Sequence, residues 1–537
     1  MSSVDQILER EVRRGMTRQD LLKRAGALGL VVTAGSFGPL TEAAFARTQI
    51  KRGGTFRFAV PGGPSDFIDG EHIVAKSDQA RRMATFDPLT IFDEQGKIQL
   101  ALAEELTAEK ADQYLIRVQD GIEFHNGKTL TIDDVIYSIR RTLNPKLKLF
   151  GQGPFGAIDP KRIKKLDERT CRLFLSRPDI TLLEAFAQHY QGVVPVGYSP
   201  TGFGKGPLRY NGTGPFTVKS FTPGRESVHV RNPNYWRDGQ PYFDEVRIIN
   251  FTGDSSKMNA LFSGQVDAVI DVPFAQVPLV KGRKNLRLYT AQTGAWTPLC
   301  MRVDTAPYND VRVRRALRLL ANRPQMVQQG LSGFGRVAND MYGPFDPAYP
   351  SDFPQRKYDP EQAKSLLKQA GQSDLAIELI TSPQDTGMVE GATIFAQNAK
   401  AGGVKVTVNN RADAFYDDQY LKYPFSGDYW GTRNYLQQVA VGVLKTAAFN
   451  ETHWDAYPKY PQFAKLYNQA LSTVDDKKRT AIIRVMQKME YDDGGLIIPF
   501  FKNLTDGYSA KVGGFKVDRG TLNLNKYGNG FRTIYFI

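Results

Sequence analysis

Predicted strands and helices alternate along nearly the whole chain, and this pattern indicates an α/β protein with mixed sheets. The 537 residues are enough for several domains or for one large two-lobed unit. Hydrophobic residues make up 41% of the chain and charged residues 23%, which is typical of a globular protein with a sizeable core. We see no internal repeat and no low-complexity linker, so we expect the domains to be interleaved along the sequence.

Residues 1–46 are predicted to be a signal peptide. Basic residues recur between positions 10 and 24, an uncharged stretch follows over 25–41, and Ala44-Phe45-Ala46 has the form of a cleavage site. A twin-arginine signal is only partly matched because Gln19 stands where the second arginine belongs, so the Sec and twin-arginine routes both remain open. A retained anchor and an amphipathic surface helix are the alternatives. No later stretch reaches the length of a membrane span.

In the first half of the mature chain, alternating apolar residues followed by turn residues predict strands, and capped amphipathic stretches predict helices. The helix over 131–142 has Thr131 as its N-cap with Asp134 three residues later. A second helix should end at Gly264. The expected strands cover 55–60, 114–118, 228–230 and 246–249, and the expected helices cover 131–142 and 257–262.

The second half continues the alternation. The helix that begins at Pro360 should stop at Gly371, because proline suits the first turn and glycine the position after the last. An amphipathic helix with a basic face is expected over 313–320. The other expected elements are strands over 375–380 and 404–408 and helices over 360–369, 389–401, 461–472 and 477–490.

Charge and chemistry narrow the function classes. The net charge of +14 suits nucleic acid, an acidic substrate or an anionic membrane, but the basic clusters lack the interleaved aromatics of a nucleic-acid platform. Cys171 and Cys300 exclude a disulfide scaffold, while one disulfide and two separate buried thiols both remain open. Neither a zinc-hydrolase histidine pair nor a serine-nucleophile motif is present. The profile favours a binding protein, and an exported enzyme is the alternative class.

Nine short motifs then occur in an order that resembles one family. The chain is similar to the solute-binding proteins of ABC importers, in the family 5 type that includes dipeptide-, oligopeptide- and nickel-binding members. One departure is Leu100, which stands where these proteins usually have proline. The matching segments are residues 51–56, 93–104, 121–127, 211–216, 231–236, 241–246, 263–267, 310–317 and 358–364.

The resemblance implies a two-lobed fold of the periplasmic-binding-protein type II kind with an extra subdomain in lobe I, and a ligand held in the cleft between the lobes. It also implies an exported, periplasmic protein, monomeric and without catalysis, cofactor, metal or nucleic acid. This protein would deliver a peptide or small-molecule ligand to membrane permease subunits. The implied divisions are 1–46 signal peptide, 47–95 lobe I, 96–205 subdomain, 206–300 lobe I, 301–505 lobe II and 506–537 return to lobe I.

The family's peptide-binding members place an aspartate in a D-Y-x5-F-L stretch, where it pairs with the ligand's ammonium group. Asp428 occupies that place here, although it could instead cap local backbone. Between this aspartate and the next aromatic, the chain carries Trp430 and Arg433, where acidic residues or proline are usual. Arg433 suits a carboxylate. The implied substrate-binding set is Asp428, Arg433, Trp430, Phe425, Trp296 and Arg302, and an opine, an oligosaccharide or a metal chelate is the alternative to a peptide.

Overall fold

The computed structural model describes residues 50–73, 75–199, 202–383, 385–411, 419–447, 449–520 and 523–537. The predicted signal peptide, 1–46, therefore lies outside the described residues. One large compact unit spans Gly53–Ile534, and the described residues of a second, small unit are 50–52 and Tyr535–Ile537. In the described part of the small unit, the amide of Lys51 donates to the carbonyl of Phe536 at 2.8 Å.

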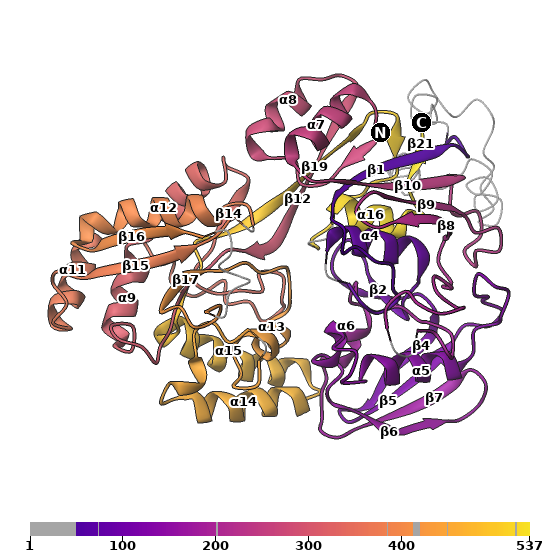
Figure 1. Ribbon diagram of the computed structural model, residues 1–537. Helices are drawn as coiled ribbons and strands as arrows, with labels where there is room; N and C mark the ends of the chain where they lie inside the picture. The colour runs from indigo at the N-terminus through magenta and orange to yellow at the C-terminus, as the bar shows by residue number, and fades with distance from the viewer. Residues whose placement is uncertain are drawn as a thin grey trace, which may run out of the picture. The chain divides into compact units, whose positions relative to one another are not determined.

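The first half of the large unit and its last segments build an eight-stranded sheet, ordered β12-β19-β11-β1-β10-β9-β8 with β14 paired to β19 (Figure 1). Parallel pairing of β1 with β10 places Thr55 beside Glu245 and Phe58 beside Ile248. The strands are β1 (Thr55–Pro61), β8 (Phe216–Thr222), β9 (Glu226–Arg231), β10 (Glu245–Phe251), β11 (Ala268–Val269), β12 (Leu286–Trp296), β14 (Gly335–Val337) and β19 (Phe500–Ser509). The accompanying helices are α4 (Lys76–Thr85), α7 (Asp254–Ser263), α8 (Val277–Lys281) and α16 (Asn523–Gly530).

A second, four-stranded sheet of order β4-β5-β7-β6 lies within the predicted subdomain. Its own apolar core is covered by α5, whose N-cap is Thr131 and whose Asp134 completes the capping box, as the sequence predicted. The elements are β4 (Ala103–Lys110), β5 (Gln113–Val118), β6 (Ile158–Lys165), β7 (Thr170–Leu175), α5 (Ile132–Thr142) and α6 (Leu182–Phe186). A short pair, β2 (Thr90–Phe92) and β3 (Ile98–Leu100), precedes this sheet.

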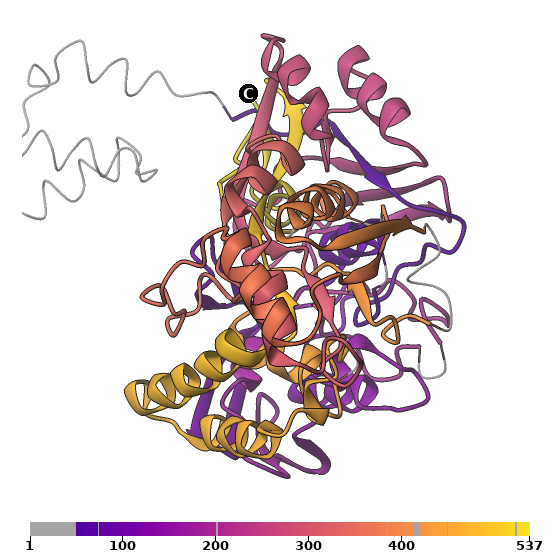
Figure 2. The same ribbon diagram turned by 90° about the vertical axis from the view of Figure 1, so that its left-hand side faces the viewer.

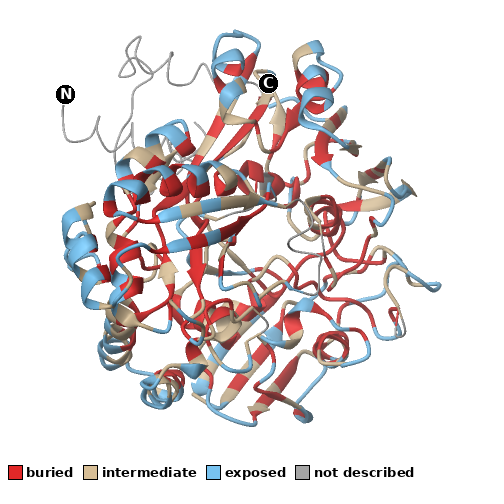
Figure 3. Cartoon of the chain, turned by 60° about the vertical axis from the view of Figure 1, so that its left-hand side comes forward, coloured by how far each residue is buried: buried red, intermediate tan, exposed pale blue. Residues whose placement is uncertain are grey.

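The remaining part builds a five-stranded sheet of order β16-β15-β17-β13-β18 (Figures 1 and 2). Burial follows the strands and the inner faces of the helices, and the outer helix faces are exposed (Figure 3). The strands are β13 (Leu299–Met301), β15 (Ala376–Thr381), β16 (Lys405–Asn410), β17 (Phe425–Gly427) and β18 (Leu496–Ile497). The helices are α9 (Val311–Leu319), α10 (Arg323–Gln325), α11 (Pro360–Gln369), α12 (Met388–Ala399), α13 (Tyr435–Gly442), α14 (Tyr460–Ser472) and α15 (Asp476–Asp493).

We call the part around the five-stranded sheet lobe II and the part around the other sheets lobe I. The long strands β12 and β19 pair antiparallel and run from the eight-stranded sheet toward lobe II, so they are the crossing segments that the resemblance implies (Figure 1). The exact lobe boundaries given above stay predictions. Cys171 on β7 and Cys300 on β13 are both buried free thiols in different sheets, which leaves no disulfide between them.

The basic face expected on the helix over 313–320 is only partly at the surface. Arg314 and Arg318 are buried, and their guanidinium groups donate to backbone carbonyls at the end of α15. Arg314 Nη2 reaches the Asp493 carbonyl at 2.6 Å, and Arg318 Nη1 reaches the Tyr491 carbonyl at 2.8 Å. The last carbonyls of a helix lack partners within the helix, so these arginines serve to satisfy them.

Two of the family-like motifs prove to be one packed unit. The turn at 121–127 lies against the loop at 211–216, where the amide of His125 donates to the Gly212 carbonyl at 2.8 Å. The Gly214 amide in turn donates to the Thr85 carbonyl at 3.0 Å. A Cβ on Gly214 would lie 2.5 Å from the Thr85 carbonyl carbon and 2.8 Å from the Phe86 nitrogen. The loop therefore needs glycine because two backbones touch there.

We expect Gly214→Ala to destabilise the protein by about 1–3 kcal/mol, because the added methyl meets backbone rather than a side chain that can move. Chemical denaturation followed by circular dichroism measures this change. Gly153→Ala is the matched control, since Gly153 has helical dihedral angles and a Cβ added there would meet no heavy atom within 4 Å. Equal stability of the two variants would contradict the packing argument.

Candidate functional site

The end of crossing strand β12 meets the segment that follows β17. The amide of Trp296 donates to the Trp430 carbonyl at 3.0 Å, and the Trp430 amide donates back at 2.9 Å. Antiparallel pairing of β13 with β17 sets Leu299 beside Gly427, and the bridge from Trp430 to Trp296 keeps the following residues next to crossing strand β12. This register brings three of the predicted site residues, Asp428, Trp430 and Trp296, to one place.

Asp428 is buried, with 4% of its surface exposed. Its carboxylate accepts from the Tyr420 hydroxyl at 3.0 Å and from the Tyr429 amide at 2.7 Å. Burial raises the pKa of Asp428 to about 6, because a charged carboxylate is poorly solvated there. Among the described residues, no lysine or arginine forms an ion pair with it. A carboxylate buried without a cation is costly unless a ligand supplies the charge.

Glu451, which was not among the predicted site residues, lies beside Asp428. This side chain is 6% exposed, and its Oε2 accepts from the Cys300 thiol at 3.6 Å. Its Oε1 has no partner among the described residues. Burial, together with the charge of Asp428, holds the pKa of Glu451 well above its ordinary value. No motif could have signalled Glu451, since it comes from a loop well separated from Asp428 in the sequence.

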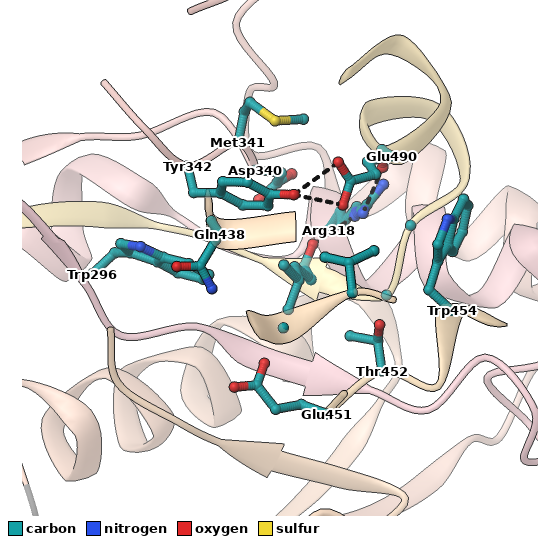
Figure 4. Close-up of a pocket in the computed structure, with 15 residues that line it drawn as sticks. Trp296, Arg318, Asp340, Met341, Tyr342, Gln438, Glu451, Thr452, Trp454 and Glu490 are labelled. Carbon is teal, nitrogen blue, oxygen red and sulfur yellow. Dashed lines mark hydrogen bonds between the residues drawn. The ribbon is translucent and has the colours of Figure 1, made fainter. Parts of the chain in front are cut away.

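Stacked aromatic rings form a wall next to the carboxyl pair. The Trp296 ring lies 6.1 Å from that of Trp430 and 5.5 Å from that of Tyr342, which stacks on Tyr435 at 5.3 Å. Trp296 and Glu451 also line a cavity of about 20 Å³ in lobe II, which is room for about one water molecule (Figure 4). Both indoles are buried, and Trp430 keeps the larger exposed fraction, 7% against 2% for Trp296.

Arg433 lies over the Trp430 ring, with its guanidinium carbon 5.3 Å from the ring centroid. Within the described structure it makes no ion pair, and its Nη1 has no hydrogen-bond partner. Tyr190 and His189 of lobe I are close enough to interact with its charge. Burial lowers the pKa of Arg433 from its ordinary value. The site thus presents an unpaired guanidinium as well as a carboxyl pair.

The two lobes touch beside Arg433. Asn434, the N-cap of α13, donates through Nδ2 to Glu184 Oε1 of lobe I at 2.8 Å. Nearby, Gln188 Nε2 lies 3.5 Å from Gln437 Oε1. Burial raises the pKa of Glu184 to about 7. Residues from both lobes therefore enclose the region that holds Arg433.

The other two predicted site residues lie apart from this cluster. Phe425 is 1% exposed, and its ring packs against Tyr308 at 5.5 Å and Phe395 at 5.9 Å in the core of lobe II. Arg302 is held by Asp304 at 2.6 and 3.0 Å and donates to the Lys422 carbonyl. Their side chains are already committed to these partners, and contact with a ligand stays a prediction for both.

The fold and the site together define a two-lobed binding protein, in which crossing strands join two α/β lobes beside enclosed charged groups. The family model for bacterial extracellular solute-binding proteins, family 5 middle, matches residues 97–446, more than half of the chain. The chain belongs to this family. Across the described ranges, no helix is both long enough and apolar enough to cross a membrane.

Similar proteins bind diverse ligands. The dipeptide-binding protein of Escherichia coli is 25% identical over 76% of this chain and 82% of its own length. Heme-binding protein A of Haemophilus influenzae is 23% identical over 86% of this chain and 90% of its own. Two solved structures share the fold, each covering 90% of this chain and 99% of its own: AgaA of A. tumefaciens R10 with agropinic acid (22% identity, TM-score 0.75) and NikZ of Campylobacter jejuni with Ni(L-His) (20%, TM-score 0.77).

Proposed function

We propose that this protein captures peptides or peptide-like solutes outside the cytoplasmic membrane and delivers them to the permease of an ABC importer. The observation that carries the ligand class is the buried Asp428 carboxylate, which has no cation among the described residues. A ligand ammonium would supply that cation, in a desolvated and hydrogen-bonded ion pair. The protein acts as an exported, periplasmic monomer that performs no catalysis.

Arg433 extends the proposal to the other end of the ligand. Its Nη1, unpartnered in the described structure, and its position against Trp430 suit a carboxylate bound through the planar guanidinium. A solute with both an ammonium and a carboxylate would then lie along the Trp430 indole. Free peptides have this pattern, and so do the amino-acid conjugates called opines. An opine is therefore the second candidate, while an oligosaccharide or a metal chelate offers neither charge in the same way.

Mass spectrometry of small molecules released from the purified, denatured protein tests the ligand class, followed by calorimetry with the species found. A mixture of short peptides supports the proposal. A single opine keeps the importer role and moves the assignment to the second candidate. A ligand without an amine, such as a sugar, contradicts the role assigned to Asp428.

Arg433→Met should weaken binding of a ligand with a free carboxylate by about tenfold to a hundredfold, the loss of one charge-assisted hydrogen-bonded contact of about 1.5–3 kcal/mol. The matched control is the same ligand with its carboxylate converted to an amide. That ligand should bind the wild-type protein and the variant about equally. An equal loss for both ligands would mean that Arg433 supports the fold of the site instead of contacting the carboxylate.

A further inference from the structure

Asp428 and Glu451 form the carboxyl pair, and the closeness of their two carboxyls affects how many protons the pair carries. Two buried carboxyls lie side by side, and the groups facing them are acids or neutral donors. Among the described residues they are the Cys300 thiol on β13, the Tyr420 hydroxyl before β17, the Trp430 indole N–H and, more distantly, the Tyr342 hydroxyl. Two like charges this close in a dry site cannot both be present at neutral pH, so one carboxyl keeps a proton.

The other charged residues that line the cavity are Arg318, Asp340 and Glu490, and Glu490 accepts from the hydroxyls of Tyr342 and Tyr435. Arg318 lines the cavity with Glu451, but its guanidinium donates to the carbonyls of Glu490, Tyr491 and Leu496. Asp340, which also lines it, is paired with Arg323 at 2.7 Å. Both residues are therefore committed to partners other than the carboxyl pair.

We infer that Glu451 carries the proton in the ligand-free protein, and that a ligand ammonium seated at Asp428 releases this proton to solvent. The inference rests on the proposed function, because it needs a ligand with an amine. Glu451 would then make the affinity of the site depend on whether the ligand group at Asp428 is cationic or neutral. A neutral group leaves the proton in place and faces an uncompensated Asp428 charge, whereas an ammonium is met by two carboxylates.

The electrostatics support this assignment of the proton. The charge of Asp428 acts on Glu451 in addition to burial, while Asp428 itself is stabilised as an anion by the Tyr420 hydroxyl and the Tyr429 amide. Burial and the two carboxyls also raise the pKa of the Cys300 thiol, so this thiol stays protonated and donates to Glu451.

The sign of the pH dependence follows from this exchange. The ligand-free site binds one proton more than the loaded site, so affinity for an amine ligand should rise about tenfold per pH unit where release is complete. As pH falls through about 6, Asp428 also becomes protonated, and the loss of affinity should become steeper. A ligand whose amine is acetylated should show neither effect.

Calorimetry at pH 7 in two buffers of different ionisation enthalpy counts the protons released when a ligand binds. The probes are dialanine and trialanine, and the control is N-acetyl-dialanine, which keeps the carboxylate but has no ammonium group. We expect release of close to one proton with the free peptides and a value near zero for Glu451→Gln. Glu451→Asp should restore release. Glu490→Gln is the matched control, because Glu490 is also buried with a raised pKa but bonds to Tyr342 and Tyr435 instead of Asp428. Glu490→Gln should release the proton as the wild type does.

Infrared difference spectroscopy of the ligand-free protein gives a readout that needs no peptide. The wild type at pH 7 should show the carbonyl band of a neutral carboxylic acid that Glu451→Gln lacks. A band unchanged by Glu451→Gln overturns the inference. Peptide binding without proton release overturns it as well, while leaving the proposed function intact. No binding of either peptide counts against the proposed ligand class, and the infrared result then decides the protonation of Glu451 separately.

Discussion

Asp428→Asn should lower the affinity for an amine-bearing ligand by about thirtyfold to a thousandfold, the cost of removing one partner of a buried charge pair. The same substitution should stabilise the ligand-free protein. Asp428 has its pKa raised from 3.8 to about 6, which at neutral pH corresponds to a penalty of about 1–3 kcal/mol that asparagine does not carry. Opposite effects on binding and stability are expected of a residue kept for its ligand.

The pH dependence separates this explanation from a simple loss of packing. Because the folded-state pKa is raised, the penalty is fully present above pH 6 and disappears below about pH 4, where Asp428 is protonated in both states. The stabilisation by asparagine should vanish in the same window. Calorimetric titration and denaturation at pH 4 and pH 7.5 measure both quantities. A variant that is less stable at pH 7.5 would show that Asp428 caps local backbone, the alternative left open by the sequence.

Arg141→Met should have the largest effect on stability, a loss of about 3–5 kcal/mol at pH 8. Arg141 is 4% exposed, and its guanidinium holds two buried acids, Asp69 at 2.9 Å and Glu71 at 2.8 Å. Methionine keeps most of the side-chain volume but leaves both acids without a cation. The contact joins α5 of the subdomain to the segment after β1, so the substitution should destabilise the core of lobe I.

The loss should shrink as the solution is acidified. Burial already raises the pKa of Glu71 to about 7 in the presence of Arg141, and protonated acids need no counter-charge. Thermal unfolding at pH 8 and pH 5 therefore checks the cause of the effect. Arg140→Met is the control, because Arg140 is the exposed neighbour on the same helix and makes one bond, to the Pro160 carbonyl at 3.2 Å. That substitution should change stability by less than about 0.5 kcal/mol. Equal losses for both arginines, or no pH dependence, would contradict the prediction.

Local elements with clear end signals were predicted well. The helix that starts at Pro360 runs to Gln369, and Gly371 after it has a φ of 71°. The helix before Gly264 ends at Ser263, and Gly264 takes the left-handed conformation expected of a helix stop. These proline and glycine signals lie within a few residues of the helix ends that they determine, so no tertiary information is needed to interpret them.

Side-chain environments were predicted less well, because they depend on what packs from elsewhere. The helix expected over 313–320 was predicted to have a basic face, yet Arg314 and Arg318 are buried against the end of α15. Phe425 packs in the core of lobe II, and its expected contact with a ligand stays a prediction. In both cases the burial of the side chain depends on partners that come from distant parts of the sequence.

The α/β class, the order of the elements and the similarity to solute-binding proteins could all be predicted from the sequence, since these depend on local periodicity, end signals and short motifs. The sequence also singled out Asp428 and Arg433. Only the tertiary structure placed Glu451 beside Asp428 and left the pair without a cation among the described residues. The physical reason is that the pKa of a buried carboxyl depends on the charges and solvent near it in space. Those neighbours are brought together by the pairing of β13 with β17, which no local pattern specifies.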